Sequence, residues 1–354
     1  MDLLIAVAIS LLPVSRIKVA AVLQELRQSG YTITLELMLD ALKIAPEQQP
    51  RVAAESRQAA ATALAEAERL RLEVVTCFDT RYPPLLACIP DPPPVLWVKG
   101  TLETFARPAV AIVGSRAATP YALQVGRRLA GDLAERGVVV VSGLARGVDS
   151  SAHEGCLAAG GETIAVLGSG LDRVYPSEHV RLSEKISQKG LVISELAPGS
   201  APVPGNFPLR NRIISGISFG TVVVEASESS GSLITAACAL RQGRDVMAVP
   251  GSVLSGRNKG SHALLKDGAK VVETAADILE ELGWGASERK RAENKGTPDP
   301  LVSKMHPGET YSFDQLVELS GVLPAKLLTR LMELELLGQV QSIPGGRFTR
   351  PSIS

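Results

Sequence analysis

From residue 109 onward the sequence repeats one pattern: a short apolar run, a loop of small residues, and then a helical stretch. The apolar runs are rich in β-branched residues and show no alternation with polar ones, which is typical of strands buried on both faces of a parallel sheet. Strands that alternate with helices predict an α/β fold, with a parallel sheet covered by helices on both sides. The predicted strands are residues 110–113, 138–141, 163–167, 191–194, 221–224, 245–249 and 269–272.

The loops after these strands are the most informative part of the sequence. Because each loop follows a strand of a parallel set, all of them are expected at the carboxyl edge of the sheet, where open α/β sheets bind ligands. The sequence therefore predicts a binding site at this edge. The loops that carry glycine, serine or arginine are residues 114–116, 142–147, 168–170 and 227–232.

The stretch at residues 207–231 joins a basic segment, a strand and a Ser/Gly loop. Arg210, Asn211 and Arg212 are expected in a turn ahead of the strand, and the loop that follows leads into a helix at 233–242. The N–H groups of the loop and of the first helical turn, with the positive end of the helix dipole, make such a junction a site for anions. Small residues are also common at strand–helix turns of α/β proteins for structural reasons alone. An anion site and an ordinary turn therefore both stay open here.

Arginines rather than lysines gather in the predicted cleft, which suggests that its ligand carries phosphates. Guanidinium groups bind phosphate oxygens in a bidentate manner, and their planes also stack on bases. Phe207 could supply one stacking platform. The alternative is that Phe207 belongs to the core and that Arg212 pairs with a carboxylate such as Glu195. The four arginines are Arg116, Arg146, Arg210 and Arg212.

Residues 1–75 are expected to form a small helical domain, because apolar residues recur at three and four spacing and helix propensity is high. The prolines of residues 76–108 forbid regular helix there, although 95–98 could form a short edge strand. This segment is an ordered connector or the entry to the α/β region, and residues 76–284 are expected to form one domain. The helices predicted in the first domain are residues 17–26, 35–42 and 52–72.

Residues 285–300 are charged, contain glycine and proline, and have no periodicity, which predicts a flexible linker. Residues 301–354 form a last unit, with helices at 313–319 and 324–337 and a hairpin that turns at 344–346. Helix–turn–helix followed by a hairpin is the plan of a winged helix. The second helix is rich in leucine and glutamate, which favours protein interaction or weak DNA contact over base-specific recognition.

The amino-acid totals exclude several classes of protein. Lys plus Arg and Asp plus Glu number 37 each, so the chain is not basic throughout, although a local basic cleft could still bind nucleic acid. Aromatic residues make up 4%, so any base-stacking surface is small. The four cysteines are far apart, as expected of reduced thiols in a cytoplasmic protein. No segment is long enough to span a membrane, and residues 1–12 lack the features of a signal peptide.

The sequence contains no recognisable cofactor or metal motif. The four histidines lack metal-ligand spacing, and neither a Walker A nor a G-x-G-x-x-G motif occurs, so no cofactor is expected. A triad of Ser142, His153 and Asp149 can be drawn, but no nucleophile-elbow motif is present, which favours a packed role for His153. Glu195 and Glu225 follow strands and could cleave an N-glycosidic bond, anchor the arginines or cap loops.

The motifs of the α/β region, taken in order, resemble those of a known family. They are residues 111–116; 142–149 with Ala152 and His153; 167–168 and 175–176; 194–195; 207–208 and 210–214; 230–232 with Thr235 and Ala236; and 250–252 with Gly260, Leu264, Gly268 and Ala269. So many motifs in one order are highly specific, and they resemble the DNA-processing protein A family (DprA, also called Smf) over residues 82–283. Residues 316–350 also resemble the winged-helix domain of many members.

The resemblance implies an extended Rossmann fold that binds single-stranded DNA in a basic pocket and forms homodimers. It also implies loading of the RecA recombinase onto incoming strands during natural transformation, with single-strand-binding protein as a further partner. Two features depart from the family: residues 11–15 lack the glycine turn with which relatives often start, and His262 stands where a small polar residue is expected. The residues assigned to DNA binding are Gly114, Ser115, Arg116, Gly143, Arg146, Phe207, Arg210, Asn211, Arg212, Ser230, Gly231 and Ser232.

Three functions follow from these observations. The first is a protein without enzymatic activity that protects incoming single-stranded DNA and loads RecA. The second is a phosphoribohydrolase of nucleoside monophosphates, which would use the same phosphate pocket with Glu225 or Glu195. The third is a scaffold with a vestigial pocket. The winged-helix unit and the lack of a clearly placed acid–base pair favour the first, so the protein is expected not to be an enzyme.

Overall fold

The structure is a computed structural model, and it describes residues 2–30, 32–284, 299–306, 309–322, 324–336, 339–343 and 347–350. The chain divides into two compact units, Met1–Leu282 and Gly283–Ser354. Each unit is described by itself. Most of the predicted linker at residues 285–300 lies outside the described residues.

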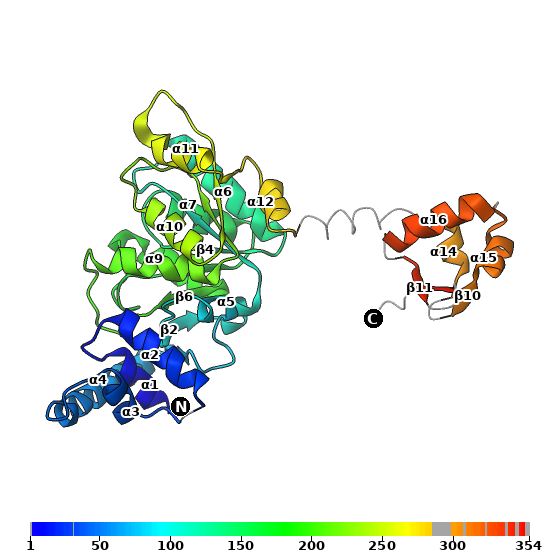
Figure 1. Ribbon diagram of the computed structural model, residues 1–354. Helices are drawn as coiled ribbons and strands as arrows, with labels where there is room; N and C mark the ends of the chain where they lie inside the picture. The colour runs from blue at the N-terminus through cyan, green and yellow to red at the C-terminus, as the bar shows by residue number, and fades with distance from the viewer. Residues whose placement is uncertain are drawn as a thin grey trace. The chain divides into compact units, whose positions relative to one another are not determined.

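A nine-stranded sheet forms the centre of the first unit (Figure 1), with the order β1-β2-β6-β5-β4-β3-β7-β8-β9. Neighbouring strands from β6 to β9 along this order are parallel, whereas β2 pairs antiparallel with both β1 and β6. The predicted α/β fold with a mainly parallel sheet is therefore confirmed. The strands are β1 (Glu73–Thr76), β2 (Val95–Gly100), β3 (Ala109–Val113), β4 (Val139–Ser142), β5 (Thr163–Val166), β6 (Leu191–Ser194), β7 (Gly220–Val223), β8 (Asp245–Ala248) and β9 (Lys270–Val271).

The strand predicted at residues 95–98 exists as β2, but the prediction that it lies at the edge is wrong. Strand β1 pairs with it from outside, with Val75 opposite Leu96. Val75, Leu96 and Val98 are all buried, so the burial of apolar side chains favours pairing over the helical continuation expected for this part of residues 1–75.

Helices cover both faces of this sheet (Figure 1). On one face, α6 (Pro120–Glu135) and α7 (Val148–Ala158) pack against each other, and α7 contacts β3, β4 and β5. On the other face, Ile213 and Ile214 of α9 (Asn206–Ile217) share a core cluster with Ala111 of β3. The remaining helices of the region are α5 (Pro84–Ala87), η1 (Leu102–Ala106), η2 (Ser177–His179), α8 (Val180–Lys189), α10 (Ser232–Arg241), η3 (Gly256–Asn258), α11 (Lys259–Lys266) and α12 (Ala275–Glu281).

The turn predicted at residues 210–212 is wrong, because these residues lie inside helix α9. Ile213, Ile214 and Ile217 are buried on the inner side of this helix, at the spacing of a helical face. Pro208 lies in the first turn, where the missing N–H of proline has no helical partner to lose. The burial of the three isoleucines against the sheet therefore determines the helix.

Four helices precede the sheet and share its core. Their buried side chains, such as Ile9 and Met38, belong to one cluster with Trp97 of β2 and Val192 of β6. Asp2 begins the first helix by accepting a hydrogen bond from the Leu4 amide at 2.7 Å. None of the described helices is both long and apolar enough to cross a membrane. The four helices are α1 (Leu3–Ser10), α2 (Arg16–Gln28), α3 (Leu35–Ala41) and α4 (Gln49–Arg69).

The second unit combines helices with a three-stranded sheet of order β10-β12-β11. Leu316, Leu331 and Leu334 form its core with neighbouring apolar side chains. The two predicted helices and the predicted hairpin strands are present, which agrees with a winged helix, while the turn at 344–346 lies outside the described residues. The elements are α14 (Pro300–Lys304), β10 (Thr310–Ser312), α15 (Phe313–Ser320), α16 (Pro324–Leu336), β11 (Gln341–Ile343) and β12 (Arg347–Thr349).

Candidate nucleic-acid interface

The candidate site lies where the order of the sheet reverses. Strand β3 pairs with β4 on one side and with β7 on the other, and the chain builds outward from it in both directions. The crevice beyond the carboxyl end of such a strand is the usual ligand site of open α/β sheets. A pocket of about 540 Å³ opens there, lined by the loops after β3, β4 and β7 and by the first turns of α9 and α10.

The structure brings nearly all of the predicted DNA-binding residues together. Two residues, Gly143 and Arg146, line a smaller hollow that adjoins the pocket and shares Arg116, Phe207 and Arg210 with it. Arg212 lines neither hollow. Those that line the main pocket are Gly114, Ser115, Arg116, Phe207, Arg210, Asn211, Ser230, Gly231 and Ser232.

Arg116 offers its guanidinium to a ligand. Its side chain is exposed, and the guanidinium carbon lies 5.4 Å from the centre of the Phe207 ring. Phe207 in turn lies 5.5 Å from the ring of Tyr175 at an interplanar angle of 43°. Among the described residues no carboxylate forms a salt bridge with Arg116. A cation and a half-buried ring at the same pocket can contact a phosphate and an unstacked base together.

Arg210 has a different role, although it lines the same pocket. Its guanidinium is buried and donates hydrogen bonds to the carbonyl oxygens of Gly143, at 2.7 Å, and Val166. Burial lowers the pKa of Arg210 to about 10, against the opposing effect of the Asp149 carboxylate. Arg210 therefore ties together the ends of β4 and β5 through Nη1, while its buried Nε has no hydrogen-bond partner.

The glycine at position 143 is explained by this packing. A Cβ atom there would lie 2.5 Å from Nη2 of Arg210, which leaves no room for a side chain. The Gly143 amide also donates to the Asp149 carboxylate at 3.0 Å, and the Ala145 amide donates to the same oxygen at 3.4 Å. Burial raises the pKa of Asp149, against the Arg210 charge and these two donors. Asp149 and Arg210 together hold the 143–147 loop in shape.

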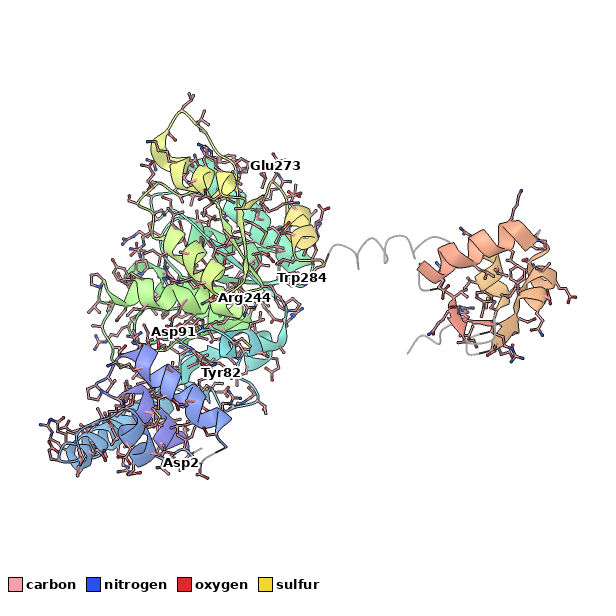
Figure 2. All side chains as sticks on the ribbon, viewed as in Figure 1. Asp2, Tyr82, Asp91, Arg244, Glu273 and Trp284 are labelled. Atoms are coloured by element: carbon pink, nitrogen blue, oxygen red, sulfur yellow. The ribbon has the colours of Figure 1, made fainter. Side chains whose placement is uncertain are left out.

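Arg212 is turned away from the pocket and supports the fold. Its guanidinium donates to Glu195 at 2.7 and 3.0 Å and to Asp91 at 2.8 Å, and its side chain is 9% exposed. Arg16 of α2 reaches the same Glu195 carboxylate at 2.8 Å. Asp91 lies where the N-terminal helices meet the sheet (Figure 2). The alternative in which Arg212 pairs with Glu195 is therefore confirmed, and Arg212 does not line the pocket to which it was assigned.

The electrostatics of Arg212 agree with this role. Burial by itself would lower the pKa of Arg212, but the charges of Glu195 and Asp91 and their hydrogen bonds outweigh it and raise the pKa. Four of the five N–H donors of this guanidinium are taken by Asp91, Glu195 and the Leu209 carbonyl, which leaves little capacity for a phosphate.

The second glutamate, Glu225, is also engaged by the protein. It is 1% exposed, and its carboxylate accepts hydrogen bonds from the Thr119 hydroxyl at 2.6 Å and the Thr119 amide at 3.2 Å. Thr119 begins helix α6, so Glu225 holds the start of this helix beside the end of β7. Neither Glu195 nor Glu225 is free to act on a ligand in this arrangement.

The drawn triad does not form. The Ser142 hydroxyl donates to the Ile112 carbonyl at 2.7 Å, and Asp149 binds backbone amides. His153 is fully buried, with Nδ1 2.7 Å from the Thr163 hydroxyl. The packed role of His153 is therefore confirmed. No group of three or more His, Cys, Asp or Glu in the described part of the chain is placed to hold a metal ion.

The Ser/Gly loop completes the wall opposite Arg116. Ser230 and Ser232 lie with their hydroxyls 2.8 Å apart, and Asn211 Nδ2 donates to the Gly231 carbonyl at 3.3 Å. Helix α10 begins at Ser232, so its positive dipole end faces the pocket. Tyr175 lines both the pocket and the smaller hollow. It belongs to one of the motifs quoted from the sequence, but it was not predicted as a site residue.

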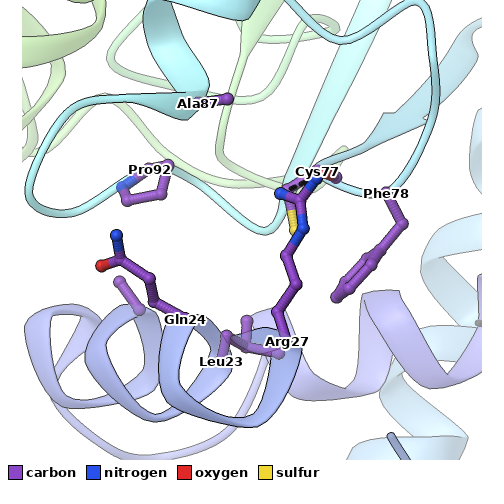
Figure 3. Close-up of a pocket in the computed structure, with 8 residues that line it drawn as sticks. Leu23, Gln24, Arg27, Cys77, Phe78, Ala87 and Pro92 are labelled. Carbon is purple, nitrogen blue, oxygen red and sulfur yellow. Dashed lines mark hydrogen bonds between the residues drawn. The ribbon is translucent and has the colours of Figure 1, made fainter. Parts of the chain in front are cut away.

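A separate hollow, of about 380 Å³, lies away from the pocket, between α2 and the connector before β2 (Figure 3). It is mainly apolar, and Figure 3 shows Arg27 reaching across it toward Cys77. Arg27 donates to the Cys77 carbonyl at 3.4 Å and lies 5.8 Å from the centre of the Phe78 ring. Burial raises the pKa of the Cys77 thiol to about 11, so the thiol stays protonated and unreactive. This hollow offers no anion site comparable to the switch-point pocket.

Comparison with known proteins gives two matching family models. The model described as DNA recombination-mediator protein A matches residues 73–283. The model described as the DprA winged helix domain matches residues 285–346. The two matches follow each other along the chain in the same order as the α/β region and the second unit.

Individual relatives agree with these models. Protein Smf of Escherichia coli (strain K12) is 41% identical over 276 residues, which cover 75% of this chain and 74% of that protein. The X-ray structure of DNA processing protein A from Streptococcus pneumoniae is 36% identical, with a TM-score of 0.72, over 79% of this chain and 98% of that one. A structure of DNA processing protein A from Helicobacter pylori, titled for its single-stranded DNA binding mode, is 31% identical, with a TM-score of 0.54, over 59% of this chain and 95% of that one.

Proposed function

The chain belongs to the DNA recombination-mediator protein A (DprA/Smf) family, and from that membership we propose that it binds single-stranded DNA in the switch-point pocket and passes the strand to the RecA recombinase. The observation that carries the proposal is the pairing of Arg116 with Phe207, an unengaged guanidinium beside a half-buried ring. Relatives named for DNA processing, and the Helicobacter pylori protein whose structure is titled for single-stranded DNA binding, support the same function.

The geometry favours a single strand over a duplex. A base can stack on Phe207 only if it leaves its own stack, which costs free energy in a duplex and little in a single strand. The pocket also supplies donors from several loops, which suits a backbone that follows a curved path. The phosphate contacts are expected to make the affinity fall with salt, with a slope of about −0.7 for each phosphate neutralised.

We propose that the protein acts without catalysis. Glu195 is bound by Arg212 and Arg16, and Glu225 holds the start of α6, so both carboxylates that a phosphoribohydrolase would need already have partners. The hydrolase alternative predicts that nucleoside monophosphates are turned over. It is tested by incubating the protein with them and measuring release of the free base.

The proposal includes partners that follow from the family. They are RecA, single-strand-binding protein on the incoming DNA, and a second copy of this chain, all in the cytoplasm where recombination occurs. The sheet's last strand, β9, has an open edge at which Val271 is 47% exposed, and an open edge of this kind suits pairing with a second copy. Light scattering of the purified protein tests the dimer.

The first experiment is fluorescence anisotropy with labelled oligo-dT and its duplex form, titrated at two salt concentrations. Salt-sensitive binding that prefers the single strand supports the proposal, and a RecA nucleation assay on strands coated with single-strand-binding protein then tests loading. Absence of binding to either form would contradict the proposal, and the turnover of nucleoside monophosphates would then be tested.

A further inference from the structure

A groove of about 550 Å³ runs beside helix α8, outside the pocket. Arg181, Lys185 and Lys189 of this helix line it, and all three side chains are exposed. They are four residues apart, so they lie in one row on the same face of the helix, about 6 Å from one another along its axis. Within the part of the chain that the structure describes, none of the three forms a salt bridge.

The other wall of the groove leaves this row of charge uncompensated. Arg127 of α6 and Glu154 of α7 line that wall and form a salt bridge with each other. Glu178 lines the near end and pairs with Arg146, with Nε 2.5 Å from Oε1. Each carboxylate of the lining therefore has an arginine partner, and the excess positive charge belongs to α8.

The groove adjoins the smaller hollow, and one continuous segment of the chain lines both. Tyr175 and Pro176 line the smaller hollow, and η2 (Ser177–His179) leads directly from them into α8. Arg146 lines the hollow, while its partner Glu178 lines the groove, so this salt bridge marks the point where the two meet.

We propose that the α8 groove carries the sugar–phosphate backbone of the same single strand where it leaves the pocket, which rests on the proposed function. A row of evenly spaced cations matches a polymer with one negative charge at each repeat. No Phe, Tyr or Trp is found among the described lining residues, so the contact is with phosphates and is independent of sequence. The direct continuation from a pocket built for phosphate and base favours the strand over an acidic protein segment.

The test compares a short oligo-dT of about 5 nucleotides, which fits the pocket alone, with a long one of about 20. The variant is Arg181→Gln/Lys185→Gln/Lys189→Gln. Its three sites are exposed, so the fold is expected to survive, as circular dichroism will check. The matched control is Lys18→Gln/Arg51→Gln/Lys266→Gln, which removes one arginine and two lysines at exposed positions away from the groove.

We expect the α8 variant to bind the long oligonucleotide about tenfold more weakly and the short one as the wild type does. Its salt slope for the long oligonucleotide should fall by about 2, from three phosphates at about 0.7 each. The control triple should bind both as the wild type does.

Three results would overturn the inference. Wild-type affinity of the α8 variant for the long oligonucleotide would leave the groove to another ligand, such as an acidic peptide. An equal loss in the control triple would show an effect of net charge alone. An equal loss for both lengths would show that α8 acts on the pocket. If the wild-type protein binds neither length, the proposed function itself fails, and the inference fails with it.

Discussion

Two sets of side chains lie within one region of the molecule. Both contain arginine, but the arginines of the two sets have different roles. The rim of the pocket presents groups that face solvent, whereas the support consists of buried groups that bind the backbone or other side chains of the protein. We define the rim as Arg116, Phe207 and Tyr175, and the support as Arg210, Arg212, Asp149 and His153.

The difference teaches that an arginine in a motif is evidence of a ligand only if its donors are free. Arg116 lies beside the Phe207 ring and forms no salt bridge with any described residue, while Arg212 donates to two carboxylates and Arg210 donates to two carbonyls. Rim and support should therefore respond differently to substitution. Changes in the rim should alter affinity and leave stability alone, and changes in the support that leave the pocket's own lining intact should do the reverse.

The largest effect is expected from Arg212→Ala. The substitution removes the main cation of Glu195 and Asp91, whose side chains are 10% and 25% exposed, and breaking such a largely buried ion pair costs about 3 kcal/mol of unfolding free energy. Urea denaturation measures the loss, and anisotropy should show unchanged affinity of the folded fraction for single-stranded DNA. The control is Arg81→Ala, because Arg81 pairs with Asp79 at a half-exposed site and should cost less than about 1 kcal/mol. A similar cost for both variants contradicts the assignment of Arg212 to the support.

Arg116→Ala should have the next largest effect, and on affinity alone. Loss of the unengaged guanidinium should weaken single-strand binding at least tenfold, or about 1.4 kcal/mol, with an unchanged melting temperature. Arg51→Ala, at an exposed position on α4, serves as the control and should bind normally. Near-normal affinity of the Arg116 variant would remove this residue from the site.

The support should also respond to pH where the rim does not. Burial lowers the pKa of His153 to about 3, with smaller contributions from His179 and Arg210, whereas the unfolded chain titrates near 6.5. The folded state therefore keeps His153 neutral, the unfolded state binds the proton first, and stability is lost as pH falls below about 6.5. At pH 5.5 the loss from this group should be about 1.4 kcal/mol relative to pH 8.

Urea denaturation at the two pH values checks this expectation. His153→Gln removes the titrating group, so its unfolding free energy should change less between pH 8 and pH 5.5 than that of the wild type. An unchanged pH dependence in this variant would show that another group is responsible.

The strands and helices that were predicted correctly are those whose position follows from the burial of an apolar run. The strand at residues 191–194 was predicted at its observed bounds, because an apolar run buried on both faces has few alternatives. Helix α9 was not predicted, because Arg210 and Arg212 suggested a polar turn ahead of Ile213, Ile214 and Ile217. Only the contact with the sheet shows which side of this helix is buried. Strand β1 was missed for a similar reason, because its partner β2 lies further along the chain, with Glu73 opposite Val98 and Thr76 opposite Val95.

Most residues assigned to the candidate site line the pocket or the smaller hollow, whereas Arg212 lines neither. Motifs and strand-following loops located the pocket, but Arg116 and Arg212 are the same residue type, and each lies in a motif of the family. Their roles depend on Glu195 and Asp91, of which Asp91 lies 121 residues from Arg212 in the sequence. Sequence order alone does not decide such pairing, so the pairing of Arg212 with Glu195 stood only as an alternative until the fold was known.

The smallest effect, and the finest test of the comparison, is expected from Phe207→Leu. Leucine keeps an apolar side chain against Gly168 and Tyr175 but removes the flat face on which a base stacks, at a cost of about 1 kcal/mol, or roughly fivefold in affinity. Anisotropy with oligo-dT measures the loss, and an abasic oligonucleotide of equal length provides the control, because a strand without bases should bind both proteins equally. A loss for the abasic strand as well would show that Phe207 acts by holding Arg116 in place, and would move the ring from the rim to the support.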